Sequence, residues 1–341
     1  MIIVYILIAI LIFGVLIFVH ELGHFLFAKK FGVAITEFSL GMGPKLISKK
    51  GNDGVDYSLR ILPIGGFVAM IGEDEESDDP NSFDKKPAWQ RFIIVMAGAL
   101  MNLIVGFIIV FFLTLSKDIY PTTVIAGFSD NSVSNQYLQP GDKIVEIDGT
   151  RVHTGSEMSY EITRKGYEPI SVTVERNGQK ITFDQVSFGT ITEQGVVFGR
   201  VDFSVFGEEK NFGNVIKHSF FTSKSMVKMV WESLLDLITG RYGVEQVSGP
   251  IGVTGAIAEA AKTDAYTLFY MAAVIAINLG IFNLLPIPAL DGGTLVFLLI
   301  EMISRKRVPK KIEYTIRNIG FALLMALVVF VAFKDVIYLF K

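Results

Sequence analysis

Four stretches of this chain are long and apolar enough to cross a lipid bilayer. The first follows Met1 directly, and the others lie at 92–115, at 265 to about 290 and at 319 to about 340. A spanning helix needs about 20 consecutive, mainly apolar residues. With 51% hydrophobic residues and 28 Phe, a chain of 341 residues is also too apolar for one soluble core. We therefore predict a polytopic α-helical membrane protein with four transmembrane helices.

Positively charged residues predict how these spans are oriented. Lys and Arg lie in two short connecting segments, at 29–91 and at 305–311. Because Lys and Arg in short loops favour the cytoplasm, we predict that both segments are cytoplasmic. Region 116–264 and both termini are then expected outside the cytoplasm. The first span has no basic segment before it and no small-residue cleavage site after it, so we expect it to be retained rather than removed as a signal peptide.

Composition excludes several classes of function. The net charge is -3 and no basic stripe with interleaved aromatic residues is present, so we expect no nucleic-acid partner. The chain has no cysteine, which excludes disulfides, thiolate catalysis and cysteine-ligated metal sites.

Two histidines and a glutamate interrupt the first apolar stretch, in the sequence VHELGHFLF at 19–27. His20 and His24 are four residues apart, so on a helix both imidazoles project from one face and can share a metal ion. Two imidazoles and one carboxylate suit zinc and leave a fourth position for water, with Glu21 as the general base for peptide hydrolysis. The alternative is that the histidines only pack the helix. Polar groups in a spanning segment usually mark a functional site, which favours the metal site.

The third protein ligand is expected far along the chain. The soluble pattern HExxHxxGxxH would continue with Gly and His, but Phe27 and Lys30 stand at these positions. The remaining histidines lie in the region expected on the other side of the membrane. The stretch NLLPIPALDGG at 283–293 lies at the cytoplasmic end of the third span, and we predict Asp291 as the third ligand. Alternatively, Asp291 caps the helix that follows.

A β-hairpin is expected between the first two spans. The alternating stretch YSLRILPIGGFVAM at 57–70 turns at Pro63, Gly65 and Gly66. Because an exposed sheet edge cannot lie in lipid, this hairpin must be shielded by protein or border a watery cavity. The acidic run at 72–81 is predicted to be a solvated loop.

The long region after the second span predicts a small soluble domain. Short strands, tight turns and a helix at 156–165 are indicated between about 120 and 205, with a turn at Asn177-Gly178. Residues 211–240 have helical spacing with one apolar face. This spacing fits either a helix lying on the membrane surface or a packed connecting helix.

The combination of HELGH in the first span with NLLPIPALDGG in a later span resembles the site-2 protease family of intramembrane zinc metalloproteases. The resemblance is to bacterial RseP-type members, and it touches most of the chain in the expected order. It extends through FSLGMGPKL (38–46), LRILPIGGFVAM (59–70), AGALMN (97–102), LQPGDKIVEIDG (138–149) and VSGPIGV (247–253).

The resemblance implies an active site with one zinc ion per chain. His20, His24 and Asp291 would bind the ion, and Glu21 would be catalytic. The segment 59–70 would be a membrane-reentrant β element that holds an unwound substrate strand at the zinc. The substrate-binding residues that it implies are Asn283, Gly65, Gly66 and Phe67.

The resemblance also implies a domain order. We expect transmembrane helices 1 and 2 with the HExxH motif and the reentrant hairpin at 1–116, and a single circularly permuted PDZ domain at 120–205. A helical connector at 206–264 and transmembrane helices 3 and 4 with the LDG motif at 265–341 would follow. The PDZ domain would either bind an extended segment or only cover the membrane cavity.

The resemblance implies partners and a location as well. Substrates would be single-span membrane proteins that another protease has already shortened, such as anti-sigma factors or remnant signal peptides. The protein would be a multi-pass protein of the bacterial inner or plasma membrane, with the active site toward the cytoplasm and the PDZ domain outside it. Two other classes remain: a metal transporter or sensor, which would not need Glu21 as a base, and a PDZ-bearing membrane scaffold, which would need no metal.

Overall fold

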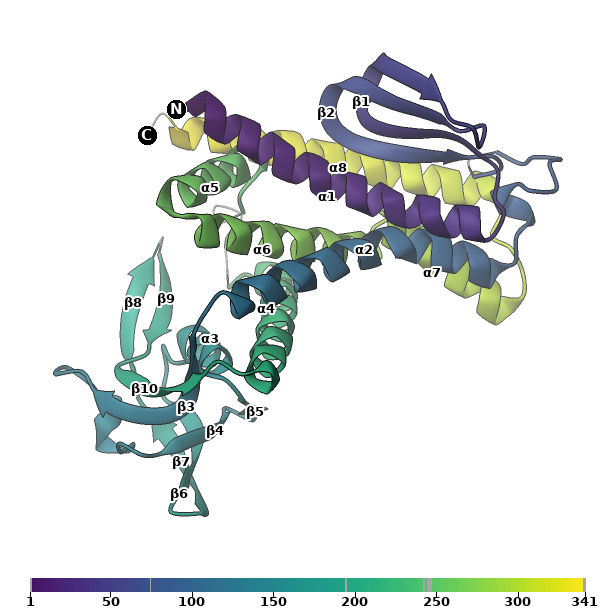
Figure 1. Cartoon of the computed structure of the whole chain (residues 1–341). Helices are drawn as coiled ribbons and strands as arrows, with labels where there is room; N and C mark the ends of the chain where they lie inside the picture. The colour runs from purple at the N-terminus through teal and green to yellow at the C-terminus, as the bar shows by residue number, and fades with distance from the viewer. Residues whose placement is uncertain (1, 74, 194, 242, 244–246, 340–341) are drawn as a thin grey trace. The chain divides into compact units, whose positions relative to one another are not determined.

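The computed structural model describes residues 2–73, 75–193, 195–241, 243 and 247–339. The chain forms two compact units. The first, here called the membrane unit, consists of Met1–Ile109 and Val247–Lys341. The second, here called the sheet unit, is Val110–Gln246. Figure 1 labels their helices and strands.

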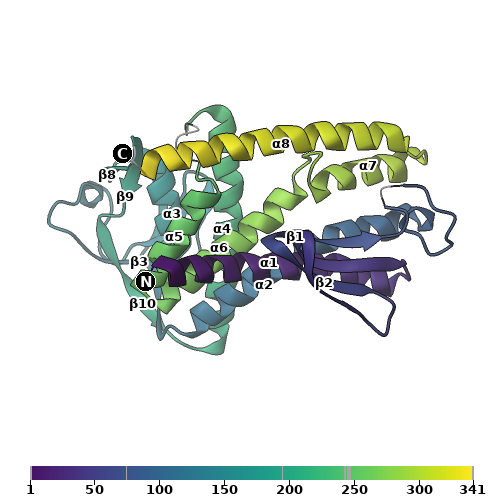
Figure 2. The same cartoon turned by 90° about the horizontal axis from the view of Figure 1, so that it is seen from above.

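The described residues contain four helices long and apolar enough to cross a membrane, as predicted. They are α1 (Ile2–Lys30), α2 (Ala88–Leu115), α6 (Ala265–Leu284) and α8 (Lys310–Leu339). The axes of α1 and α8 are nearly parallel in the two views of Figures 1 and 2. The shorter helix α5 (Pro250–Thr263) contacts α1, α6 and α8. The chain is therefore a multi-pass membrane protein with a sheet-containing domain.

Two of the predicted span boundaries were wrong. Helix α6 ends at Leu284 rather than near residue 290, because Pro286 and Pro288 cannot continue a helix. Helix α8 begins at Lys310, nine positions before the expected start at 319. Its first turns are charged, so hydropathy alone places the boundary too late.

A small sheet follows α1 in the membrane unit. It consists of β1 (Ile35–Lys50) and β2 (Asp56–Met70). Leu40 of β1 pairs with Gly66 on one side and with Leu59 on the other, so the two arms of β2 flank residues 35–40 of β1. Leu59 also pairs with Ile47, so β1 folds back as well and its residues 45–50 lie on the outer side of the first β2 arm. The chain does turn between the two arms of β2, as predicted for 57–70. The arms flank residues 35–40 of β1 instead of pairing with each other, and the long strand β1 was not predicted.

One face of this sheet packs on α1. Phe38 and Val68 from the two strands form a buried apolar cluster with Phe25 of α1 and with Val55 between the strands. The short 3-10 helix η1 (Phe83–Lys85) follows the acidic run at 72–81, of which residue 74 lies outside the described residues.

The sheet unit is built around a main sheet with the order β10-β3-β4-β6-β7, in which β5 pairs with β4. Its strands are β3 (Ile119–Phe128), β4 (Lys143–Ile147), β5 (Thr150–Arg151), β6 (Ile170–Arg176), β7 (Gln179–Val186) and β10 (Phe203–Glu209). A separate hairpin pairs β8 (Gly189–Glu193) with β9 (Val196–Arg200). The 3-10 helix η2 (Ser134–Gln136) lies between β3 and β4.

Two helices complete the sheet unit and confirm the predicted pattern. Helix α3 (Gly155–Lys165) lies where a helix was expected at 156–165, and α4 (Phe212–Thr239) lies where one was expected at 211–240. The turn between β6 and β7 is at Asn177-Gly178, as predicted. Both residues have positive φ, 53° and 78°, as the favoured two-residue hairpin turn requires.

Candidate functional site

Three side chains from distant parts of the chain converge in the membrane unit. His20 and His24 lie near the end of α1, and Asp291 is the first residue of α7 (Asp291–Ser304). The Oδ2 atom of Asp291 is 3.2 Å from Nε2 of His20 and 3.3 Å from Nε2 of His24. The two Nε2 atoms are 3.1 Å apart. This group alone, among the described residues, gathers three or more metal-ligating side chains so closely.

Small residues on α2 let the two histidines lie against that helix. A methyl group on Gly98 would lie 2.9 Å from Cε1 of His20 and closer still to Nε2 of His24. On the other helix, a methyl group on Gly23 would lie 2.9 Å from the backbone nitrogen of Gly98 and would also meet the Ala97 carbonyl oxygen. Close contact between α1 and α2 through small residues is a general way for membrane helices to pack.

Hydrogen bonds from α2 orient both imidazoles. The Nδ1 atom of His24 lies 2.9 Å from the carbonyl oxygen of Ile94, so Nδ1 carries the proton and Nε2 is free for a metal. The buried amide of Asn102 lies 3.5 Å from Nδ1 of His20, with its oxygen unpaired. Rotating this amide by half a turn makes its oxygen the acceptor for His20 Nδ1 and leaves Nε2 of His20 free as well.

The break after α6 brings Asp291 to the histidines. Beyond Leu284 the chain makes a tight turn, in which the Leu290 amide donates to the Ile287 carbonyl at 2.9 Å. A methyl group on Gly293 would lie 2.6 Å from that same Ile287 oxygen, and a methyl group on Gly292 would collide with Leu285. The two glycines therefore allow α7 to start directly against the turn. The N-cap of α7 is Leu290, so the alternative of Asp291 as the helix cap is wrong.

The three ligand atoms suit a zinc ion. Tetrahedral zinc with bonds of about 2.0 to 2.1 Å has ligand atoms roughly 3.3 Å apart, close to the separations observed. Oδ2 of Asp291 is buried and has no hydrogen-bond donor. A buried carboxylate oxygen without a donor is costly, and a cation between it and the two imidazole nitrogens removes that cost.

A cavity of about 440 Å³ opens beside these ligands. Glu21 lines it, together with His20, His24, Asp291 and Thr294. Its other walls are the β2 arm at 66–70, the residues Glu73, Phe83 and Val95, and Glu313 and Arg317 of α8. The carboxylate of Glu21 thus lies in the same cavity as the three metal-ligating side chains.

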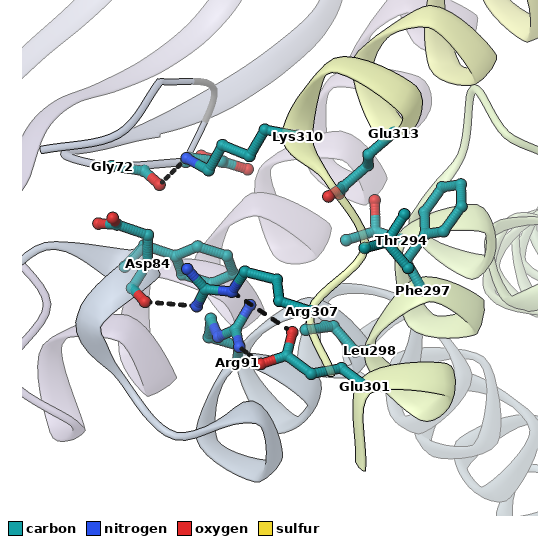
Figure 3. Close-up of a pocket in the computed structure, with 13 residues that line it drawn as sticks. Gly72, Asp84, Arg91, Thr294, Phe297, Leu298, Glu301, Arg307, Lys310 and Glu313 are labelled. Atoms are coloured by element: carbon teal, nitrogen blue, oxygen red, sulfur yellow. Dashed lines mark hydrogen bonds and ion pairs between the residues drawn. The ribbon is translucent and has the colours of Figure 1, made fainter. Parts of the chain in front are cut away.

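A smaller pocket of about 30 Å³ adjoins this cavity, because both are lined by Glu73, Phe83, Thr294 and Glu313. Figure 3 shows hydrogen bonds and ion pairs between residues that line it. Arg91 of α2 contacts Glu301 of α7 at 2.5 Å, and Arg307 donates to the Asp84 carbonyl oxygen at 2.5 Å. Lys310 donates to the Gly72 carbonyl oxygen at 3.1 Å. These bonds hold the start of α8 next to the segment after the small sheet.

The residues predicted to bind substrate do not all reach the cavity. Gly66 and Phe67 line it. Gly65 instead lines a separate apolar groove formed with Gly14 and Phe18 of α1. Asn283, near the end of α6, is half-buried and is not among the described residues that line the catalytic cavity.

Sequence reasoning missed two contributors to the site. Asn102 was not predicted to contact the site, although an asparagine within an apolar spanning segment is itself a signal for a functional contact. The carbonyl of Ile94 carries no such signal, because a backbone acceptor is not visible in residue identity.

Comparison with known proteins agrees with this geometry. The model of Peptidase family M50 matches residues 8–327. A candidate zinc metalloprotease of Clostridium perfringens is 36% identical over 335 residues, which cover 98% of this chain and 99% of the relative. Zinc metalloprotease RasP of Shouchella clausii is 31% identical over 417 residues, covering 97% and 98%. Regulator of sigma-W protease RasP of Bacillus subtilis is 29% identical over 414 residues, covering 97% and 98%.

The helices and the comparisons together define a membrane-bound zinc metalloprotease. The chain belongs to peptidase family M50, the site-2 protease family, since the family model matches nearly all of it. The predicted family, enzyme class and zinc cofactor are thereby confirmed.

Proposed function

We propose that this protein hydrolyses peptide bonds within or near the transmembrane segment of single-span membrane proteins. The observation that carries the proposal is the meeting of His20, His24 and Asp291 at one point of the membrane unit, with Glu21 in the same open cavity. Zinc bound there would polarise the peptide carbonyl and acidify a water molecule. Glu21 accepts the proton of the attacking water and returns it to the leaving amine.

The small sheet holds the substrate in this proposal. A transmembrane helix hides its amides in internal hydrogen bonds, so the segment to be cut must unwind before it can react. The β2 arm at 66–70 pairs with β1 on one side and lines the catalytic cavity. An unwound segment can add to such an edge as a further strand. Gly66 and Phe67 are the contacts that we assign to it, and Gly65 and Asn283 remain predicted substrate-binding residues.

We assign the remaining parts as the sequence predicts. Residues 1–116 and 265–341 form the catalytic membrane part, with its site toward the cytoplasm of a bacterial inner or plasma membrane. Residues 206–264 form the extracytoplasmic connector. In 120–205, taken as a PDZ domain, the motif LQPGDKIVEIDG builds a turn whose Asp142 accepts from the Gln139 amide at 2.8 Å and pairs with Arg176 at 2.7 Å. This role is structural.

The substrate class is membrane proteins that another protease has already shortened. The Bacillus subtilis relative is named a regulator of sigma-W protease, which supports anti-sigma factors as substrates of this class. A remnant signal peptide has the same features, namely one apolar span and little mass outside the membrane.

Cleavage of a tagged single-span substrate by the purified full chain in liposomes tests this function. Glu21→Gln should lower kcat by roughly 10² to 10⁴ while bound zinc is kept, because Glu21 handles protons and does not ligate the metal. A zinc chelator should abolish cleavage, and added zinc should restore it. Equal rates for wild type and Glu21→Gln, with zinc bound in both, would contradict the proposal.

A further inference from the structure

The small sheet of the membrane unit has a polar face that the proposed function does not use. Arg60 lies on β2 and donates from three different nitrogens. Its Nε bonds the Ser39 hydroxyl at 2.9 Å, and its two terminal nitrogens bond the Gly43 carbonyl at 2.6 Å and the Glu37 carboxylate at 2.8 Å. Ser39 is fully buried. One guanidinium therefore joins β2 to three positions of β1.

The same guanidinium also contacts the wall of the catalytic cavity. Its central carbon lies 4.9 Å from the centre of the Phe67 ring, a cation–π contact. Phe67 lines the cavity that holds Glu21 and the metal ligands. Arg60 and Phe67 lie on the two arms of β2, which flank β1. The arginine thus reaches across β1 to the arm that borders the cavity.

We propose that Arg60 is a positioning residue for substrate, which fixes the Phe67 ring and the β2 arm at 66–70 in the conformation that receives the unwound strand. This proposal rests on the proposed function, because it requires that substrate lies along this arm. Arg60 acts through Phe67 and is not among the described residues that line the cavity. Its effect is on where the peptide bond lies relative to the ligands, and not on the metal itself.

Arginine suits this role better than lysine. A guanidinium is planar, so it can stack on a ring while its edge donates several hydrogen bonds in a fixed fork. Lysine offers one flexible point charge and would keep the Glu37 ion pair without the stack. Misplacing a substrate by about 1 Å can cost roughly 10²-fold in rate, so a fixed ring next to the reacting bond has a measurable consequence.

Lys45 provides a matched control. It belongs to the same polar face, where it pairs with Glu37 at 3.1 Å and with Asp56 at 2.5 Å. Its described ion pairs end at these two carboxylates, and neither of them lines the catalytic cavity. Removing Lys45 therefore takes one cation from the sheet while leaving the contact with Phe67 in place.

The test compares Arg60→Met, Arg60→Lys, Lys45→Met, Phe67→Leu and the double variant of Arg60→Met with Phe67→Leu in the full chain. Cleavage of one tagged single-span substrate in liposomes gives kcat and KM, and mass spectrometry of the products gives the cleavage positions. Arg60→Met should lower kcat/KM by about tenfold or more and spread cleavage over neighbouring bonds, with zinc content unchanged. Arg60→Lys should show the same spread to a smaller degree, and Lys45→Met should match wild type.

The remaining variants exclude a merely structural role. Phe67→Leu removes the stack but leaves the hydrogen bonds of Arg60, so it should spread cleavage as Arg60→Met does. Because the two residues act as one unit, the double variant should lose little more than the worse single variant. If Arg60→Met does not fold, Arg60→Lys and Phe67→Leu still decide the question.

Three results would overturn the proposal. One is a single unchanged cleavage position in both Arg60→Lys and Phe67→Leu, and another is equal losses in Arg60→Met and Lys45→Met. The third is a double variant whose fold loss in kcat/KM equals the product of the two single losses. Failure of the proposed function looks different, because wild type itself would then show no cleavage that depends on Glu21.

Discussion

Two carboxylates, one in each unit of this protein, are satisfied in different ways. In the sheet unit, the buried carboxylate of Asp202 accepts from the Val133 amide at 2.7 Å and from the amide and hydroxyl of Ser134 at 3.0 and 2.6 Å. In the membrane unit, the buried Oδ2 of Asp291 has no donor and lies 3.2 and 3.3 Å from two imidazole nitrogens. The protein's own donors satisfy the carboxylate of Asp202, whereas that of Asp291 needs a bound cation as its partner.

This difference distinguishes Asp291 from Asp202 better than burial does. Both carboxylates are largely removed from water, and both face polar atoms. Nearly all buried polar groups in folded proteins are hydrogen-bonded, so an unpaired one indicates a missing partner. Removing Asp291 should therefore affect metal content first, and removing Asp202 should affect stability first.

The largest effect is expected at the metal ligands. Asp291→Ala and His24→Ala should reduce zinc from one ion per chain to background, and cleavage should fall below detection, because neither leaves three protein ligands. Metal analysis of the purified protein checks this, with Glu21→Gln as the control that keeps zinc. Full zinc content in Asp291→Ala would remove Asp291 from the site.

A large effect on stability, without loss of zinc, is expected at Asp202. Asp202→Ala leaves buried donors of Val133 and Ser134 unpaired, which should cost the sheet unit about 3 kcal/mol. Amide hydrogen exchange of β3 and β10 in the full chain measures this loss. Asp130→Ala removes an exposed carboxylate from the segment just before Val133 and should stay within about 0.5 kcal/mol of wild type. Equal exchange in both variants would refute the assignment.

A smaller effect is expected from pH. Burial lowers the pKa of His218, which stacks on Tyr120 and bonds Glu208 at 2.6 Å. Below about pH 6.5 the unfolded chain binds a proton at this residue before the folded chain does, so the sheet unit should lose stability as pH falls from 7 to 5. His218→Gln, which does not titrate, should flatten this dependence in hydrogen exchange. An unchanged slope would show that other groups cause it.

The smallest effect is expected from exposed charges. Hydrogen bonds from Lys29 and Tyr57 lower the pKa of Asp53 to about 2, although this carboxylate is open to water. Exposed ion pairs contribute little to stability because solvent screens them. Asp53→Asn should therefore leave zinc content, cleavage rate and thermal unfolding in detergent as in wild type. A clear loss in zinc content, cleavage rate or thermal stability would show that the ion pair of Asp53 and Lys29 matters as much as a buried one.

The metal ligands could be predicted from the sequence, but their support could not. His20 and His24 share a helix face because of their spacing, and Asp291 was the acidic residue expected on the same side of the membrane. The bonds that orient the imidazoles come from α2, at Ile94 and Asn102. Which backbone carbonyl or amide lies opposite an imidazole depends on how two helices cross, and residue patterns do not encode that crossing directly.

The fold shows the same limit. Helices α3 and α4 and the turn at Asn177-Gly178 follow from local spacing and were predicted. Strand β1 was not, because Gly41 and Gly43 interrupt its alternation with φ values of 88° and 84°. It is a strand because both arms of β2 pair with it, which is a tertiary cause. Elements with a regular local pattern could thus be predicted from the sequence. Strand β1 could not, because it depends on contacts with other elements.

The glycine at position 98 has a consequence for how this enzyme can vary. Glycine and alanine differ by one methyl group and by a single nucleotide, and in most helices alanine is the more favourable of the two. Here that methyl group would compete for space with both imidazoles. Replacing Gly98 by alanine can therefore be as damaging as the loss of a zinc ligand, although the glycine itself takes no part in the reaction.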